Sequence, residues 1–231
     1  MFSIIEKIND VIREEIESEP KRNYIGASAI GHPCSRKIWY EFNGYDGEPI
    51  SEKLKLTFDI GKIIEKKILN YFDLYLDGPN FVDYNNNEFQ DKTINEFQGN
   101  CDAIIRIITI EPDIKGSFSK LIILEIKTAN NASFNKFKKN GLRVWNEQYY
   151  AQCQSYMGMS SIHQSILLAI NKDTSEMHEE WVEYDPIYYG MLKQKAKDII
   201  EAKEPPARIN ESPLFYVCQM CQFKRVCHST L

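Results

Sequence analysis

The stretch LIILEIKTAN, Leu121–Asn130, decides the fold. Its four consecutive aliphatic residues are typical of a buried strand, yet Glu125 and Lys127 follow directly. Because side chains alternate along a strand, these two charged groups share one face about 7 Å apart, while Ile126 faces the other way. An isolated ion pair in a protein core usually does not repay its desolvation. Either the strand ends in solvent, or the two charged groups have a chemical role.

A second predicted strand lies just upstream and contains the segment GNCDAIIRI, residues 99–107. If the two strands form a hairpin, Asp102 lies beside the end of the strand that carries Glu125. Two carboxylates at one sheet edge can hold a hard divalent cation, which prefers oxygen ligands. A neighbouring ammonium such as that of Lys127 can orient an attacking water or offset charge that develops on a phosphate. The hairpin therefore favours the chemical role over the solvated strand end.

The remaining pattern predicts an α/β fold with a small mixed sheet flanked by helices. The predicted helices cover residues 3–18, 54–75, 143–159 and 186–203. The predicted strands cover residues 98–110, 119–127, 165–172 and 176–185, with a loop containing Pro112 and Gly116 between the first two. There is no repeat and no long linker, so we expect residues 1–231 to form a single domain.

Composition limits the possible classes of protein. The 231 residues are 43% hydrophobic, enough for a full core. No apolar run reaches the roughly 18 residues of a membrane span, and the N-terminus is too acidic for a signal peptide. We therefore expect an intracellular (cytoplasmic) protein without a membrane partner. The net charge of −5 opposes nucleic-acid binding only mildly, because basic residues gather locally in segments such as 135–143.

Three motifs occur in order along the predicted strand, strand and helix: Gly99-x-x-Asp102, Glu125-x-Lys127 and Gln152-x-x-x-Tyr156. Together they resemble the RecB-like branch of the PD-(D/E)XK nucleases, which have a restriction-endonuclease-like core. The resemblance implies that Mg²⁺ or Mn²⁺ is held by Asp102, Glu125 and the carbonyl of Ile126. It also implies a catalytic Lys127, with Gln152 and Tyr156 near the active site.

The helix over 54–75 contains Gly61 in its interior, which costs about 1 kcal/mol relative to Ala and therefore indicates a packing reason. Many members of the family have a His four residues after such a Gly and use it at the metal site. Here Glu65 occupies that position. Its carboxylate suits Mg²⁺ as a third ligand, and a solvated glutamate at the helix edge is the alternative. In the helix over 143–159, we expect Trp145 and Tyr149 to be core residues.

The C-terminal segment CQMCQFKRVC places Cys218, Cys221 and Cys227 at C-x₂-C-x₅-C spacing. With Cys34 as a fourth ligand, the arrangement resembles the iron–sulfur subset of RecB-like nucleases, such as CRISPR-adaptation exonucleases and AddB-type nuclease domains. The resemblance implies a [4Fe–4S] cluster that joins segments around 24–44 and 212–231. Four cysteines also suit zinc, and His32 or His228 could replace one thiolate.

Cys101 and Cys153 have no partner at ligand spacing and are interpreted as buried apolar residues. Free thiols remain the third alternative for the other four cysteines.

Basic residues suggest where DNA would bind. The segment NASFNKFKKNGLRVW interleaves aromatic and cationic side chains, a combination that holds single strands. A solvated basic loop with core phenylalanines is the alternative. The predicted contacts to nucleic acid are Arg36, Lys37, Phe137, Lys138, Lys139 and Arg143.

These inferences predict a metal-dependent DNA exonuclease that acts on single strands or DNA ends and works with recombination, repair or CRISPR-adaptation proteins. The alternative is a non-catalytic nucleic-acid-binding module with an iron–sulfur or zinc site. The intact set of Asp102, Glu125 and Lys127 favours the enzyme.

Overall fold

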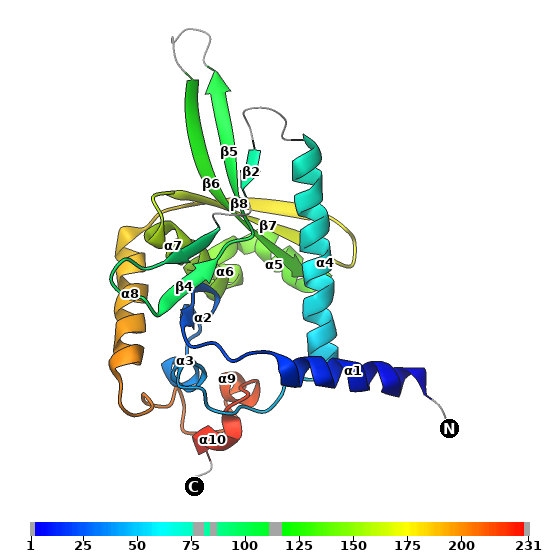
Figure 1. Ribbon diagram of the computed structural model, residues 1–231, viewed down its shortest axis with the longest axis vertical. Helices are drawn as coiled ribbons and strands as arrows, with labels where there is room; N and C mark the ends of the chain where they lie inside the picture. Colours follow the sequence, from blue (N-terminus) through cyan, green and yellow to red (C-terminus); the bar gives the residue numbers. More distant parts are fainter. Residues whose placement is uncertain (1–2, 76–80, 84–86, 111–116, 229–231) are drawn as a thin grey trace.

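The computed structural model describes residues 3–75, 81–83, 87–110 and 117–228. It is a mixed α/β protein with two sheets rather than the single predicted sheet (Figure 1). The five-stranded sheet has the order β2-β5-β6-β7-β8 and contains Phe81–Asp83, Ala103–Ile110, Ser117–Ala129, Gln164–Asn171 and Met177–Glu183. The three-stranded sheet has the order β1-β4-β3 and contains Ile25–Gly26, Phe97–Asn100 and Glu88–Gln90.

The helices surround these sheets. The four longest are α1 (Ile4–Ser18), α4 (Glu52–Tyr75), α7 (Glu147–Met159) and α8 (Pro186–Glu201). The shorter ones are α2 (Ala27–Ile30), α3 (Ser35–Phe42), α5 (Asn131–Asn140), α6 (Leu142–Trp145), α9 (Tyr216–Gln219) and α10 (Lys224–His228). None of the helices in the described segments is both long and apolar enough to span a membrane.

The strand predicted over 98–110 is broken, which is why there are two sheets. Its first part, β4, pairs with β1 and β3, and its second part, β5, pairs with β2 and β6. At the break, the Cys101 N–H donates to the Asn87 carbonyl at 3.0 Å instead of joining the β5–β6 ladder. The predicted hairpin itself is confirmed, because β5 pairs antiparallel with β6 and Ala103 lies opposite Leu124. Its loop with Pro112 and Gly116 lies outside the described residues.

The helix predicted over 143–159 is also divided. Asn146 adopts an extended conformation between α6 and α7, and its side chain accepts hydrogen bonds from the N–H groups of Gln148 and Tyr149. An Asn side chain that caps a helix in this way starts α7 at Glu147 and ends α6 at Trp145. The segment before α6, to which the sequence analysis assigned no helix or strand, forms helix α5 with Asn130 as its N-cap.

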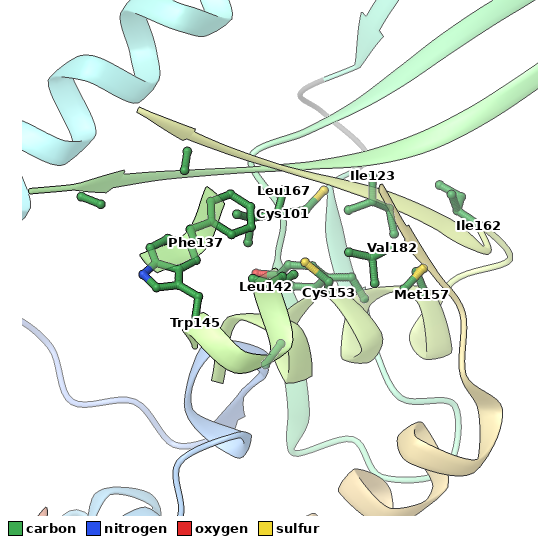
Figure 2. Close-up of a cluster of buried hydrophobic side chains, with 14 of the residues drawn as sticks. Cys101, Ile123, Phe137, Leu142, Trp145, Cys153, Met157, Ile162, Leu167 and Val182 are labelled. Atoms are coloured by element: carbon green, nitrogen blue, oxygen red, sulfur yellow. The ribbon is translucent and has the colours of Figure 1, made fainter. Parts of the chain in front are cut away.

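Helices cover both faces of the five-stranded sheet. On one face, Ile64, Ile68, Leu69 and Phe72 of α4 pack against the aliphatic side chains of β5, β6 and β7. On the other face, α5, α6 and α7 bury a larger core. Figure 2 shows part of this core, with Phe137 beside Trp145 and with Cys101, Cys153 and Met157 beneath the sheet. Helix α7 packs on α2 and contacts both sheets, through β3 and β4 of the smaller one and β6 and β7 of the larger one.

Candidate active site

The first motif is built by a close approach that only glycine allows. A Cβ atom on Gly99 would lie 2.6 Å from the Ala27 Cβ and 2.8 Å from the Tyr156 Cε1. The missing side chain therefore lets the Tyr156 ring lie against β4. The Tyr156 hydroxyl donates to the Asn100 carbonyl at 2.6 Å. This bond fixes α7 to the strand that leads directly into Asp102.

Glu125 is buried, with 1% of its surface exposed, and lies below α7. Its Oε1 accepts hydrogen bonds from the Gln152 side-chain amide at 2.7 Å and from the Lys127 ammonium. The same Gln152 amide nitrogen donates to the Tyr156 hydroxyl at 2.7 Å. The structure thus brings the second and third sequence motifs into one hydrogen-bonded network at the end of β6.

Asp102 and Glu65 bring two further carboxyl groups to the same place. The Asp102 Oδ2 accepts the backbone N–H of Ile126 at 2.6 Å, and the Asp102 and Glu65 side chains are hydrogen-bonded to each other. Burial and the charge of Asp102 raise the pKa of Glu65 to about 7. Burial likewise raises the pKa of Glu125, to about 8, and that of Asp102.

Lys127 supplies the positive charge of the site. Burial lowers its pKa, but the carboxylates of Glu125 and Asp102 outweigh this effect, so that the pKa is raised overall. Its ammonium lies 5.1 Å from the centroid of the Tyr149 ring, within the range of a cation–π interaction. Sequence reasoning placed Tyr149 in the core and missed this contact. Its position on α7, three residues before Gln152, is the signal that could have revealed it.

The arrangement favours a cation among the carboxylates. Burial raises the pKa of all three carboxyl groups, and a divalent ion, which prefers such oxygen ligands, would favour their charged forms. In addition, Glu125 Oε2 is buried and has no hydrogen-bond partner among the described residues. Within the described ranges, no three His, Cys, Asp or Glu side chains already converge on a single ion position. The structure shows the Ile126 N–H bound to Asp102; a ligand role for the Ile126 carbonyl stays a prediction.

Helix α4 passes the end of β6 at its interior glycine. A Cβ atom on Gly61 would lie 3.4 Å from the Thr128 hydroxyl, which is ordinary van der Waals contact, so the predicted packing reason for this glycine stays a prediction. One turn later on the same helix, Glu65 reaches Asp102. Glu65 is half-buried rather than solvated at the helix edge, so it belongs to the carboxylate group.

The four predicted cluster cysteines line a single cavity. Cys34 is the N-cap of α3, whereas Cys218, Cys221 and Cys227 come from α9, α10 and the turn between them. Burial raises the pKa of Cys218 and of Cys221, and the nearby Cys34 and Cys227 raise both further. An iron or zinc partner would stabilise the thiolate forms of Cys218 and Cys221, which burial disfavours.

The surroundings of this cavity carry positive charge. Arg36, Lys37, Arg208 and Lys224 line it together with the cysteines. The Arg208 guanidinium also donates to the Cys227 carbonyl, at 3.0 and 2.8 Å. His228 lines the same cavity, and neither of its buried ring nitrogens has a hydrogen-bond partner in the described part of the chain. His32 instead accepts the Cys34 N–H through Nδ1 at 3.1 Å.

The remaining cysteines agree with their interpretation as buried apolar residues. Cys101 and Cys153 are 2% and 0% exposed, and burial raises the pKa of Cys153 to about 12 and raises that of Cys101.

The residues predicted to touch DNA divide into two groups. Phe137 is fully buried and stacks on Trp145 at 4.6 Å between ring centroids, so its predicted contact with a base is wrong and the alternative of a core phenylalanine holds. Arg36 donates to the Pro206 carbonyl, and Lys37 pairs with Glu41.

The other three predicted DNA contacts lie at or near the surface. Lys138 pairs with Glu176, and Lys139 is exposed. The Arg143 guanidinium lies near the rings of both Tyr150 and Tyr188, 5.2 and 5.1 Å from their centroids. For these residues and for Arg36 and Lys37, binding to DNA stays a prediction.

Several solved structures have folds similar to that of this chain. A protein described as SSO0001 has 19% identity and a TM-score of 0.57, over 100% of this chain and 98% of that one. An alkaline exonuclease from Laribacter hongkongensis, LHK-Exo, has 12% identity and a TM-score of 0.54, over 81% and 90%. The structure of LHK-Exo with dAMP has 12% identity and a TM-score of 0.56, over 78% of this chain and 87% of that one.

At such identities, the likeness shows a shared fold, one that is found in an exonuclease. No family model matches the sequence, and no curated protein matches it.

Proposed function

We propose that the chain is a metal-dependent deoxyribonuclease of the exonuclease type. The observation that carries this proposal is the meeting of Glu65, Asp102 and Glu125 with Lys127 at the end of β6. A solvated strand end would not bury Glu125 or attach it to Gln152 and Lys127. The alkaline exonuclease with the same fold supports the proposal, and its complex with dAMP agrees with DNA as the substrate.

Each residue of the site has a part in the proposed reaction. Glu65, Asp102, Glu125 and the Ile126 carbonyl would hold Mg²⁺ or Mn²⁺, which when bound supplies Lewis acidity and a water of lowered pKa. The Lys127 ammonium would offset the negative charge that grows on the phosphate as the water oxygen, losing a proton, bonds to phosphorus and the bond from phosphorus to the leaving sugar oxygen breaks, that oxygen taking up a proton. Gln152 holds the Glu125 carboxylate in place, and Tyr156 anchors Gln152 to β4 through Asn100.

The four-cysteine cavity has a separate role in this proposal. A [4Fe–4S] cluster, or zinc as the alternative, would join the segment around Cys34 to the C-terminal segment. It lies among α3, α9 and α10, away from the carboxylates, and would stabilise the fold rather than cut DNA. The cationic side chains that line the cavity would offset negative charge on the thiolates of a bound cluster or zinc ion.

A nuclease assay tests the proposal. End-labelled single- and double-stranded DNA are incubated with the protein and Mn²⁺, with Mg²⁺, or with EDTA. We expect shortening from an end with either metal and none with EDTA. Glu125→Gln protein purified in parallel is the control for contaminating nucleases. If the wild type and this variant degrade DNA equally, or if neither does, the chain is not a nuclease, and the non-catalytic module becomes the better hypothesis.

A further inference from the structure

Helix α4 extends the candidate active site beyond the edge of the sheet. At 100° per residue, positions 58, 65 and 72 lie within about 40° of one another and define one face of the helix. Phe72, at the C-terminal end of this face, packs against the five-stranded sheet. Glu65, in the middle, meets Asp102. Phe58 is the next member in the N-terminal direction, where the end of β6 at Thr128 approaches Gly61.

The N-terminal part of this face of α4 is apolar and exposed to solvent. Phe58 is 50% exposed, and Leu54, one turn before it on the same face, is 41% exposed. Figure 1 shows that the N-terminal half of α4 runs past the sheet toward α1. An exposed aromatic ring in line with a buried carboxylate site is a feature that the proposed catalytic residues do not explain.

Helix α1 covers a different side of α4 and fixes it in place. The buried Lys55 ammonium binds both carboxylate oxygens of Asp59 at 2.8 Å and the Glu15 carboxylate of α1 at 3.2 Å. Lys55 and Asp59 lie roughly 80° to 120° around the helix from Glu65. The helix is thus held by α1 along its flank, and among the described residues the side that carries Phe58 stays exposed and accessible to a ligand.

We propose that Phe58, with Leu54 beside it, forms a subsite for an unpaired nucleobase of the DNA strand being cut. This inference rests on the proposed nuclease function, because the scissile phosphate has to reach Glu65, Asp102 and Glu125. Seven residues of helix separate Phe58 from Glu65 by roughly 10 Å along the axis, so a neighbouring nucleotide can reach the ring. Aromatic rings bind single-stranded DNA by stacking on bases without sequence preference.

Charge on α4 agrees with a nucleic-acid ligand. Lys62, next to Gly61, is exposed, and its positive charge acts on Glu65. A phosphate between the stacked base and the carboxylates would find this ammonium close by. Phe137, the aromatic residue first considered for stacking, is buried in the core and cannot serve. Phe58 supplies the exposed ring that a single-strand site needs.

Binding measurements on single-residue variants test the subsite. A fluorescent single-stranded oligonucleotide is titrated with protein in Ca²⁺, which we use in place of Mn²⁺ to suppress cleavage. We expect Phe58→Ala to weaken binding at least about fivefold and Phe58→Trp to preserve it. The matched control is Leu56→Ala, because Leu56 is 49% exposed but lies on the opposite face of α4 from Glu65. Equal affinity of the Phe58→Ala and Leu56→Ala proteins would overturn the proposal.

A series of oligonucleotides, each lacking one base near its end, identifies the stacked base. With wild-type protein, we expect one abasic position to weaken binding; with Phe58→Ala, that position should cause no further loss. An unchanged abasic penalty in the variant would show that the base does not stack on Phe58.

Cleavage of the same DNA in Mn²⁺ separates the two proposals. If cleavage occurs but Phe58→Ala binds normally, only the subsite is wrong. If the Phe58 effect occurs without cleavage, the face binds bases and the nuclease proposal is wrong.

Discussion

At the scale of single residues, Lys127 and Glu125 form an ion pair, but their replacements should affect cleavage and metal binding differently. Lys127→Ala should lower the cleavage rate by a factor of about 10² or more, because one stabiliser of the transition state is lost. It should leave Mn²⁺ affinity nearly intact. Glu125→Gln should weaken Mn²⁺ binding as well as cleavage. Titration calorimetry with Mn²⁺ and cleavage rates on the same preparations check this, and wild-type rates in both variants would contradict it.

Tyr149 provides the second contact of the Lys127 ammonium. A metal ion bound by Glu125 would compete with Lys127 for Oε1, so the Tyr149 ring becomes more important for positioning the ammonium. We expect Tyr149→Phe to keep the cleavage rate and Tyr149→Leu to lower it roughly tenfold. In a Lys127→Ala background, Tyr149→Leu should lower the cleavage rate no further. Tyr150→Leu, which removes a similar contact with Arg143, is the control and should add its effect independently. Additive effects of Tyr149→Leu and Lys127→Ala would contradict the positioning role.

The raised pKa values of the carboxyl groups predict how stability depends on pH. In metal-free protein, Glu65 and Glu125, with pKa values of about 7 and about 8, bind protons more tightly when folded than when unfolded. Their contribution to stability is therefore present at low pH and is lost as pH rises through this range. His32, whose pKa is lowered to about 4, acts in the opposite direction, but only below about pH 6.5.

Between pH 6.5 and 8, the Tm in EDTA should therefore fall, and saturating Mn²⁺ should raise it most at pH 8. Melting curves at the two pH values, with and without Mn²⁺, measure this. Glu125→Gln should flatten the pH dependence. A Tm in EDTA that stays constant or rises over this interval would contradict the linkage.

At the scale of elements, the packing of α7 on β4 depends on Gly99. Gly99→Ala would place a methyl group within 2.8 Å of the Tyr156 ring and even closer to Ala27. We expect a loss of about 1–3 kcal/mol in the free energy of unfolding, together with reduced cleavage, because Tyr156 must shift. Urea denaturation followed by fluorescence measures the change.

Gly190→Ala is the matched control for this substitution. Gly190 lies inside α8, and its added Cβ would meet no atom within 4 Å. This change should therefore stabilise the protein by about 0.5–1 kcal/mol. Equal effects of the two substitutions would show that the close approach at Gly99 is unimportant.

Elements also show what could be predicted from the sequence. The helix 3–18, the helix 54–75 and the strands of a hairpin follow from the hydrophobic period, and the structure has both helices and a hairpin of β5 with β6. The break at Cys101 could not be predicted in the same way, because partners distant in the sequence, such as the Ile126 N–H bound by Asp102, help to determine it. The cap at Asn146 is local, since its side chain accepts from Gln148 and Tyr149, and an Asn before a helix is a start signal that the sequence reasoning missed. Phe137 was misplaced for a similar reason: only the tertiary stack with Trp145 distinguishes a core ring from an exposed one.

At the scale of the whole molecule, the fold contains two separate candidate sites, the carboxylate site and the cysteine cavity. The carboxylate site depends on contacts between β4, β5, β6, α4 and α7, whereas the cysteine cavity joins α3 to the C-terminal segment. Hydrogen bonds also link these distant segments: Arg36 to the Pro206 carbonyl at 3.1 Å, and Trp39 to the Ala202 carbonyl at 2.9 Å. The fold should therefore weaken, but not disappear, when the proposed cluster is lost.

Replacing one cysteine tests this coupling. Anaerobically purified protein should be brown and contain iron and labile sulfide. Cys34→Ser should lose most of the iron and lower the Tm by roughly 10 °C, because a bond between two ends of the chain is lost. Cys153→Ala is the control, since Cys153 is buried in the core and is not among the residues lining the cavity; it should keep the iron.

Iron analysis and melting curves on both variants test the prediction. A Cys34→Ser protein with full iron content and an unchanged Tm would show that Cys34 is not a ligand. A colourless wild type with stoichiometric zinc would replace the cluster by zinc.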